Sequence, residues 1–247
     1  LLHQAQLIRQ HQLPIDYFLI DDGWHDKPWL LDLIRSLHSL GFRVGLWYAP
    51  YTRHAHLPIY PTLDHLINDY QLDLLKLDFL YKLYFAPHLA DDSLPHQTLV
   101  EIFTYLQTHY PALYTIACGS PFAPALGRVD AIRFSKDTTF PPPVPRWARR
   151  LLYRSRLRLL ATEYNLIPTN FSSIPDPDVR LFSLDDATTA AFWDKISGTC
   201  LGLGDDVSQL TPTQLEQALL WLQKNLSSPS SSPRSTKRVI SPSSSEI

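Results

Sequence analysis

Two patterns of apolar residues alternate along the chain. Short, nearly continuous apolar runs are typical of strands buried in a sheet, and apolar residues spaced three or four positions apart are typical of helices that bury one face. We therefore predict strands over residues 16–21, 43–50, 72–79, 112–119, 129–137, 171–175 and 199–206. Between them the pattern predicts helices over 1–12, 28–40, around 99–106, 146–160 and from Thr211 onward.

Two of these helices have clear ends. Gly41 follows the second helix and is a favourable residue just past a helix end. Thr211, Pro212 and Gln214 form the sequence of a capping box, in which Thr211 is the N-cap and Gln214 lies three residues later.

The alternation of strands and helices predicts an α/β fold with a parallel sheet. Seven strands in a chain that begins on a helix predict a (β/α)8 TIM barrel that lacks its first strand. An open, doubly wound sheet is the alternative, but the glycine-rich phosphate loop expected after its first strand is absent. Residues 226–247 are rich in serine and proline, so we predict a catalytic barrel over 1–225 and a disordered tail over 226–247.

Composition narrows the classes of function. A net charge of −2 gives no electrostatic reason to expect a nucleic-acid or membrane partner, and no apolar run is long enough to span a bilayer. Two cysteines, Cys118 and Cys200, are too few for a disulfide framework, which favours a reducing compartment and predicts a cytoplasmic location. The chain contains no methionine, so we expect the natural N-terminus to lie upstream.

One basic segment, 146–158, contains six arginines. Their spacing also suits the solvent-exposed face of an outer barrel helix, and nucleic-acid binding is not predicted from it.

Reactive groups of a TIM barrel lie at the carboxyl ends of its strands. Acids there can also cap the next helix, and this is the reading we prefer for Asp205 and Asp206. Asp64, Asp185 and Asp186 likewise look like residues at helix starts. The remaining candidates at the strand ends are Asp21, Asp22, Trp47, Lys76, Asp78, Cys118, Arg133, Asp137, Asp176 and Asp178.

Lys76 and Asp78 are two positions apart in an apolar strand, so their side chains point the same way. A cation at close range favours the ionised form of a buried carboxylate, which is the form that a carboxylate nucleophile needs. A buried structural ion pair is the alternative reading.

If Asp137 reaches the same end of the barrel as Asp78, the site has two carboxylates that face each other, as in glycoside hydrolases. Trp47 would offer an aromatic surface to a sugar ring, and Asp21 and Asp22 would accept hydrogen bonds from sugar hydroxyls. No third metal ligand converges on this pair, so we predict no metal and no cofactor.

Seven motifs in sequence order strengthen this interpretation: IDDGW, GLWYAP, LLKLDFLY, ACGSPFAPALGRVDAIRFSKDTTF, PRWARRLL, DPDVRLF and LGLGDDVSQL. Together they resemble the α-galactosidases of glycoside hydrolase family 36, from about Ile15 to Leu210.

The resemblance implies a retaining double displacement on an oligosaccharide or other α-galactoside. It implies Asp78 as the nucleophile and Asp137 as the acid/base. It implies galactose binding by Asp21, Asp22, Trp47, Lys76, Cys118 and Arg133.

The chain departs from the family in three places. The first barrel strand and the β-sandwich domain before it are absent, the connection after GLWYAP is short, and Ile174 and Pro175 stand where the family often has Asn. Two alternatives therefore stay open: a transglycosidase of the raffinose-synthase type, and an inactive sugar-binding remnant of the barrel. The oligomeric state is not predicted.

Overall fold

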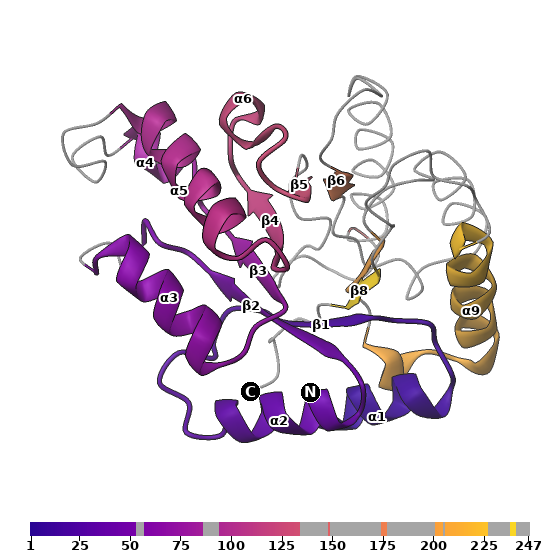
Figure 1. The fold of residues 1–247 in the computed structure, drawn as a ribbon. Helices are drawn as coiled ribbons and strands as arrows, with labels where there is room; N and C mark the ends of the chain where they lie inside the picture. The colour runs from indigo at the N-terminus through magenta and orange to yellow at the C-terminus, as the bar shows by residue number, and fades with distance from the viewer. Residues whose placement is uncertain are drawn as a thin grey trace.

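A computed structural model describes residues 1–52, 57–85, 94–133, 148, 174–176, 201–204, 206–226 and 238–240. For 174–176, 201–203, 224–226 and 238–240 only the backbone is described. The helix predicted over 146–160 lies outside the described residues apart from Ala148. Within them, strands alternate with helices that surround the strands on the outside (Figure 1).

The described residues form one parallel sheet of eight strands in the order β6-β5-β4-β3-β2-β1-β8-β7. Neighbours in sequence pair with each other except β6 and β7, which are the two ends of the order. Strand β8 returns to the edge of β1, as in the strand order of a (β/α)8 barrel. The strands are β1 (Tyr17–Ile20), β2 (Arg43–Tyr48), β3 (Leu74–Leu77), β4 (Tyr114–Cys118), β5 (Ala131–Arg133), β6 (Ile174–Asp176), β7 (Leu201–Leu203) and β8 (Arg238–Ile240).

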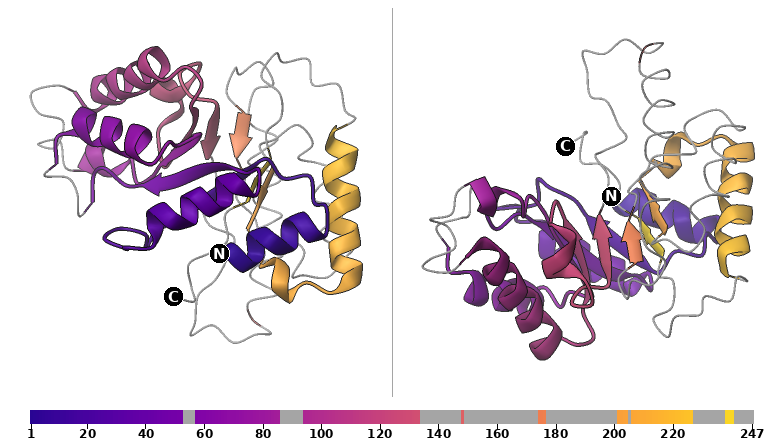
Figure 2. Two further views of the ribbon diagram at one scale, coloured as in Figure 1. Left: turned by 60° about the horizontal axis from the view of Figure 1, so that its bottom comes forward. Right: turned by 90° about the horizontal axis from the view of Figure 1, so that it is seen from above.

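The helices lie between these strands in sequence. Both views in Figure 2 show α9 beside α1, and buried residues of the two helices belong to one apolar cluster. The helices are α1 (Leu2–Gln10), α2 (Leu30–Ser39), α3 (Ile59–Asp69), α4 (Lys82–Phe85), α5 (Pro95–His109), α6 (Phe122–Ala125), the 3₁₀ helix η2 (Val207–Gln209) and α9 (Pro212–Leu226).

The two predicted helix ends are confirmed. Gly41 has φ +79 just after α2, a conformation that glycine adopts without a steric penalty. At α9, the Gln214 N–H donates to the Thr211 hydroxyl at 3.3 Å, and the Thr211 N–H donates to the Gln214 side-chain oxygen at 2.8 Å. Helix α3 lies in the connection after GLWYAP, where only a helix start at Asp64 was predicted; Asp64 lies inside the helix.

Two apolar clusters show the two faces of the sheet. The larger one joins alternate strand residues, among them Phe18, Leu46 and Leu75, to the helices outside. The smaller one is formed by the other strand positions and contains no helix residue, which identifies it as the inner face. Its members are Tyr17, Leu19, Leu74, Tyr114, Ile116 and Ala131.

Strand β8 corrects the sequence interpretation at 238–240. It lies inside the range predicted as a disordered tail, and it pairs in parallel with β1 (Tyr17↔Val239) and with β7 (Gly202↔Val239). Val239 and Ile240 are β-branched residues, which fit a strand, but the surrounding serines hid them in the sequence. The edge of β1, expected to be open in a barrel without its first strand, is occupied.

Candidate active site

The inner face changes character along the strands. Near their amino ends it is apolar, and Tyr17 and Tyr114 bring their ring centroids to 5.6 Å. Two or more residues further along, the same face carries polar and aromatic groups, because side chains alternate with a period of two. These are Asp21 after β1, Trp47 in β2, Lys76 in β3, Asp78 after β3, Cys118 at the end of β4 and Arg133 at the end of β5.

Asp78 is held by donors from neighbouring strand ends. The Trp47 indole N–H donates to Asp78 Oδ2 at 2.8 Å, and the backbone N–H of Phe79 donates to Oδ1 at 2.5 Å. The backbone N–H of Asp78 donates to the carbonyl of Tyr48 at 2.9 Å. The carboxylate therefore has a fixed place at the carboxyl end of β3 and β2.

Cys118 brings four of the predicted site residues together. Burial raises the pKa of its thiol well above the ordinary value, the positive charges of Arg133 and Lys76 oppose that rise, and the charge of Asp78 and a hydrogen bond to it add to it. The charges of Arg133, Lys76 and Asp78 therefore all act on the Cys118 thiol. A thiol with a raised pKa stays protonated near neutral pH, so it is a donor to the Asp78 carboxylate.

The two cations of the site are deeply buried. Lys76 is 3% exposed and Arg133 is 4% exposed. Buried cations need negative partners, and Asp78 is the carboxylate that shares the Cys118 environment with both of them. This agrees with the sequence prediction that Lys76 and Asp78 share one side of the strand, although β3 itself ends at Leu77.

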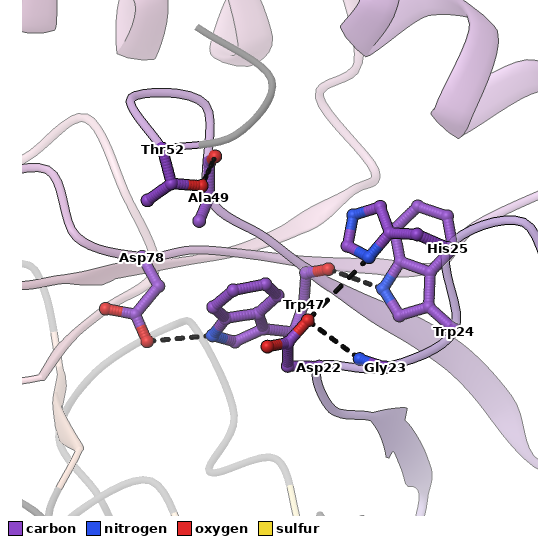
Figure 3. Close-up of polar contacts among 8 residues, drawn as sticks. All are labelled: Asp22, Gly23, Trp24, His25, Trp47, Ala49, Thr52 and Asp78. Atoms are coloured by element: carbon purple, nitrogen blue, oxygen red, sulfur yellow. Dashed lines mark hydrogen bonds and ion pairs between the residues drawn. The ribbon is translucent and has the colours of Figure 1, made fainter.

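Trp47 lies between Asp78 and a second aromatic pair (Figure 3). The indole N–H of Trp24 donates to the Trp47 carbonyl at 2.7 Å, and the His25 ring stacks on Trp24 with centroids 3.9 Å apart. His25 also meets Trp47 edge to face at 6.3 Å. The ring of Trp47 is thus fixed from the side opposite Asp78.

The two acids of the IDDGW motif, Asp21 and Asp22, differ in their exposure to solvent. Asp21 is half-buried directly after β1, whereas Asp22 is exposed and its Oδ1 lies 3.7 Å from Nδ1 of His25. The same oxygen accepts a hydrogen bond from the Gly23 N–H at 2.7 Å. Asp22 is therefore turned toward its own loop.

Three contributors were missed in the sequence. Trp24 was not named as a candidate, although it is the last residue of the IDDGW motif, and that motif could have identified it. His25 follows the motif, and only its stacking on Trp24 shows a role. Phe79 gave no sign in the sequence that its backbone adopts φ +52.

Several predicted residues lie outside this description. Asp137, Asp178, Asp185, Asp186 and Asp205 are outside the described residues, and the side chain of Asp176 is not described, although its backbone is in register with Arg133. Asp206 is a cap, as expected, but of η2: it accepts from the Ser208 N–H at 3.0 Å. Within the described residues no group of three potential metal ligands is found, and no helix is long and apolar enough to cross a membrane.

Comparison with known proteins gives structural matches only. No family model matches the chain, and no curated protein matches it. Among solved structures it is similar to an α-galactosidase from Thermus thermophilus in complex with stachyose, with a TM-score of 0.64 and 18% identity over 90% of this chain and 60% of that one.

Two further structures are similar. One is a putative α-galactosidase from Bacteroides fragilis, with a TM-score of 0.62 and 15% identity over 91% of this chain and 55% of that one. The other is an α-galactosidase from Saccharomyces cerevisiae with raffinose, with a TM-score of 0.60 and 14% identity over 90% and 60%. The chain spans 55% to 60% of the length of these three structures. These likenesses confirm the α/β barrel fold.

Proposed function

We propose that this chain is a catalytic barrel of a retaining α-galactosidase of the family 36 type. The observation that carries the proposal is the fixed Asp78 carboxylate, which lies at the carboxyl end of β3 with donors from Trp47 and Cys118. The fold it shares with α-galactosidases, one of which was crystallised with stachyose and another with raffinose, supports the same substrate class.

The proposed reaction is a double displacement. An Asp78 oxygen attacks the anomeric carbon, the bond from that carbon to the leaving oxygen breaks, and Asp137 gives its proton to the leaving oxygen. Asp137 then takes a proton from water, whose oxygen attacks the same carbon and releases Asp78. Two inversions at the anomeric carbon produce the α-anomer.

The surrounding residues have separate tasks in this proposal. Trp47 and Cys118 orient the attacking carboxylate through their hydrogen bonds, and Lys76 and Arg133 balance its negative charge. Asp21 and Asp22 accept hydrogen bonds from sugar hydroxyls. For Asp22 this requires its carboxylate to turn from His25 toward the sugar. No cofactor takes part in these steps.

The test is hydrolysis of p-nitrophenyl α-galactopyranoside by the purified chain and by Asp78→Asn, which keeps the size of the side chain and removes its charge. We expect turnover by the parent, its near-complete loss in Asp78→Asn and initial release of α-galactose in the NMR spectrum. Initial release of the β-anomer, or full activity in Asp78→Asn, would contradict the mechanism.

Asp137 is tested by its leaving-group dependence. Asp137→Ala should lose hydrolysis of stachyose, whose leaving group needs a proton, and retain much of the first step with the aryl glycoside. Equal loss on both substrates would exclude Asp137 as the acid. Galactosyl transfer to an added sugar, in place of hydrolysis, would assign the chain to the transglycosidase alternative.

A further inference from the structure

We propose that the outer three of four connected aromatic side chains, which lead away from Asp78, bind the sugar units of an oligosaccharide beyond its terminal galactose. We call Trp47, Phe79, Tyr81 and Phe85 the aromatic track. The inference rests on the proposed function, because it extends the same site outward, and it assigns the chain to oligosaccharide substrates in preference to small galactosides.

Ring contacts connect the track without a gap. The centroids of Trp47 and Phe79 are 6.0 Å apart, those of Phe79 and Tyr81 are 6.1 Å apart, and those of Tyr81 and Phe85 are 6.2 Å apart. All three pairs meet edge to face, at 87°, 81° and 79°. The edge of one ring therefore meets the face of the next along the whole track.

Exposure increases along the track. Trp47 is 6% exposed and bonded to Asp78, Phe79 is partly buried, Tyr81 is 42% exposed and Phe85 is 83% exposed. Leaving a phenylalanine ring this exposed forgoes most of the free energy that its burial would provide. An exposed apolar surface that continues from a polar site is typical of a ligand-binding groove.

The backbone holds the track in an unusual conformation. Phe79 has φ +52, a backbone conformation that is uncommon and strained for a residue with a side chain. Gly119, directly after β4, has φ +65. The Tyr81 ring packs so close to Gly119 that a Cβ at position 119 would lie 2.9 Å from Tyr81 Cδ1. Strain next to a catalytic residue is common at functional sites, and here it places the Phe79 ring between Trp47 and Tyr81.

The chemistry of the track suits a sugar chain. Sugars combine an apolar C–H surface with hydroxyls, and aromatic faces with a few polar groups bind such ligands. The Tyr81 hydroxyl supplies a donor and acceptor, and the Lys82 ammonium lies 4.9 Å from the Phe79 ring centroid, where it can also donate to hydroxyls. Direct continuity with Trp47 and Asp78 favours the same ligand for the track and the site over a separate protein partner.

The experiment measures equilibrium binding of two probes, stachyose and methyl α-galactoside, by titration calorimetry. Every chain in the titrations, the parent included, carries Asp78→Asn, so that the probes are bound but not hydrolysed. The variants are Phe85→Ala, at the outer end of the track, and Tyr84→Ala as a matched control. Tyr84 lies on the same helix, is 37% exposed and stands outside the series of ring contacts that defines the track. Neither position belongs to the proposed catalytic machinery.

We expect Phe85→Ala to bind stachyose about 2- to 12-fold more weakly than the parent, since an aromatic contact contributes about 0.5–1.5 kcal/mol. Methyl α-galactoside should bind both alike, and Tyr84→Ala should match the parent with both probes. Equal stachyose affinity in the parent and Phe85→Ala overturns the inference, and so does a parent that does not bind stachyose.

The outcome separates the inference from the proposed function. A parent that binds stachyose through Phe85 but does not hydrolyse it contradicts the proposed reaction and supports the track. If the parent hydrolyses the aryl galactoside but Phe85→Ala leaves the affinity for stachyose unchanged, the proposed reaction is supported and the role of the aromatic track in binding is contradicted.

Discussion

The indole N–H of Trp47 lies 2.8 Å from Asp78 Oδ2 and ties the carboxyl ends of β2 and β3 together at the candidate nucleophile. The same tryptophan receives a hydrogen bond at its carbonyl from Trp24, 2.7 Å away. Asp78 is therefore oriented by a tryptophan that is itself held in place.

Trp47→Phe tests this relationship, because it keeps an aromatic ring and removes the donor to Asp78. A hydrogen bond to a charged group contributes about 1.5–3 kcal/mol, so hydrolysis of p-nitrophenyl α-galactopyranoside should fall about 10- to 100-fold in kcat/KM. Trp29→Phe, on α2 away from the site, is the matched control and should keep the parent rate. Unchanged kcat/KM in Trp47→Phe would show that the bond does not orient the carboxylate for reaction.

Cys118→Ser and Cys118→Ala separate the donor from the volume of the side chain. Serine keeps an O–H that can donate to Asp78, whereas alanine has no donor. We expect Cys118→Ser to retain clearly more kcat/KM than Cys118→Ala on the aryl galactoside. Equal activities would mean that the thiol only fills space.

The raised pKa of the Cys118 thiol also predicts a pH dependence of stability. Above its ordinary value of 9.0 the unfolded thiol ionises while the buried one keeps its proton, so the free energy of unfolding falls as the pH rises through this range. Cys118→Ser lacks this loss, and its free energy of unfolding relative to the parent should rise between pH 8 and 10 in urea titrations. A constant difference across that range would contradict the prediction.

Gly119→Ala should destabilise the fold. The positive φ alone costs a residue with a Cβ about 1–2 kcal/mol, and the new Cβ would lie 2.9 Å from Tyr81 Cδ1. Gly41→Ala has the same kind of backbone strain with its nearest atom at 4.0 Å, so it should cost less. Adding Tyr81→Ala to Gly119→Ala should restore part of the loss in thermal unfolding, and no recovery would exclude the steric explanation.

We expect the free energy of unfolding to depend on acidic pH through Asp64. Tyr105 and Tyr110 each donate a hydrogen bond of 2.6 Å to its Oδ1, and these bonds hold the pKa of Asp64 below its ordinary value of 3.8. The stabilisation is therefore present above that pH and is lost as the pH falls through the lowered pKa.

Asp64→Asn should accordingly show a shallower loss of unfolding free energy from pH 5 to pH 3 than the parent. The double variant Tyr105→Phe/Tyr110→Phe keeps the carboxyl group and removes its donors, and it should show the same shallower dependence. A slope in either variant as steep as that of the parent would count against these hydrogen bonds as the source.

We expect thermal stability and self-association to depend on whether a truncated chain keeps β8. A chain that ends at Ile240 keeps the pairing of β8 with β1 and β7, whereas one that ends at Leu226 exposes the edge of β1. Open edges pair with other chains, so the shorter chain should unfold at a lower temperature and self-associate in light scattering. Identical behaviour of the two chains would mean that β8 does not protect β1.

The sequence by itself determined much of this protein. Apolar periodicity placed β1 to β7 and the helices α1, α2, α5 and α9, because burial of one face depends on spacing alone. The period of two also brought Lys76 and Asp78 to one side of β3, and the rule that barrel sites lie at strand ends selected Trp47, Cys118 and Arg133.

Only the tertiary structure decided the rest, because it depends on contacts between distant segments. Asp64 was expected at a helix start, yet it lies inside α3 and accepts bonds from two tyrosines near the end of α5. Val239 pairs with a strand edge that lies 222 positions earlier in the chain, as the register Tyr17↔Val239 shows. The hydrogen bond from Trp47 to Asp78 likewise joins positions 31 residues apart, which spacing along one strand cannot reveal.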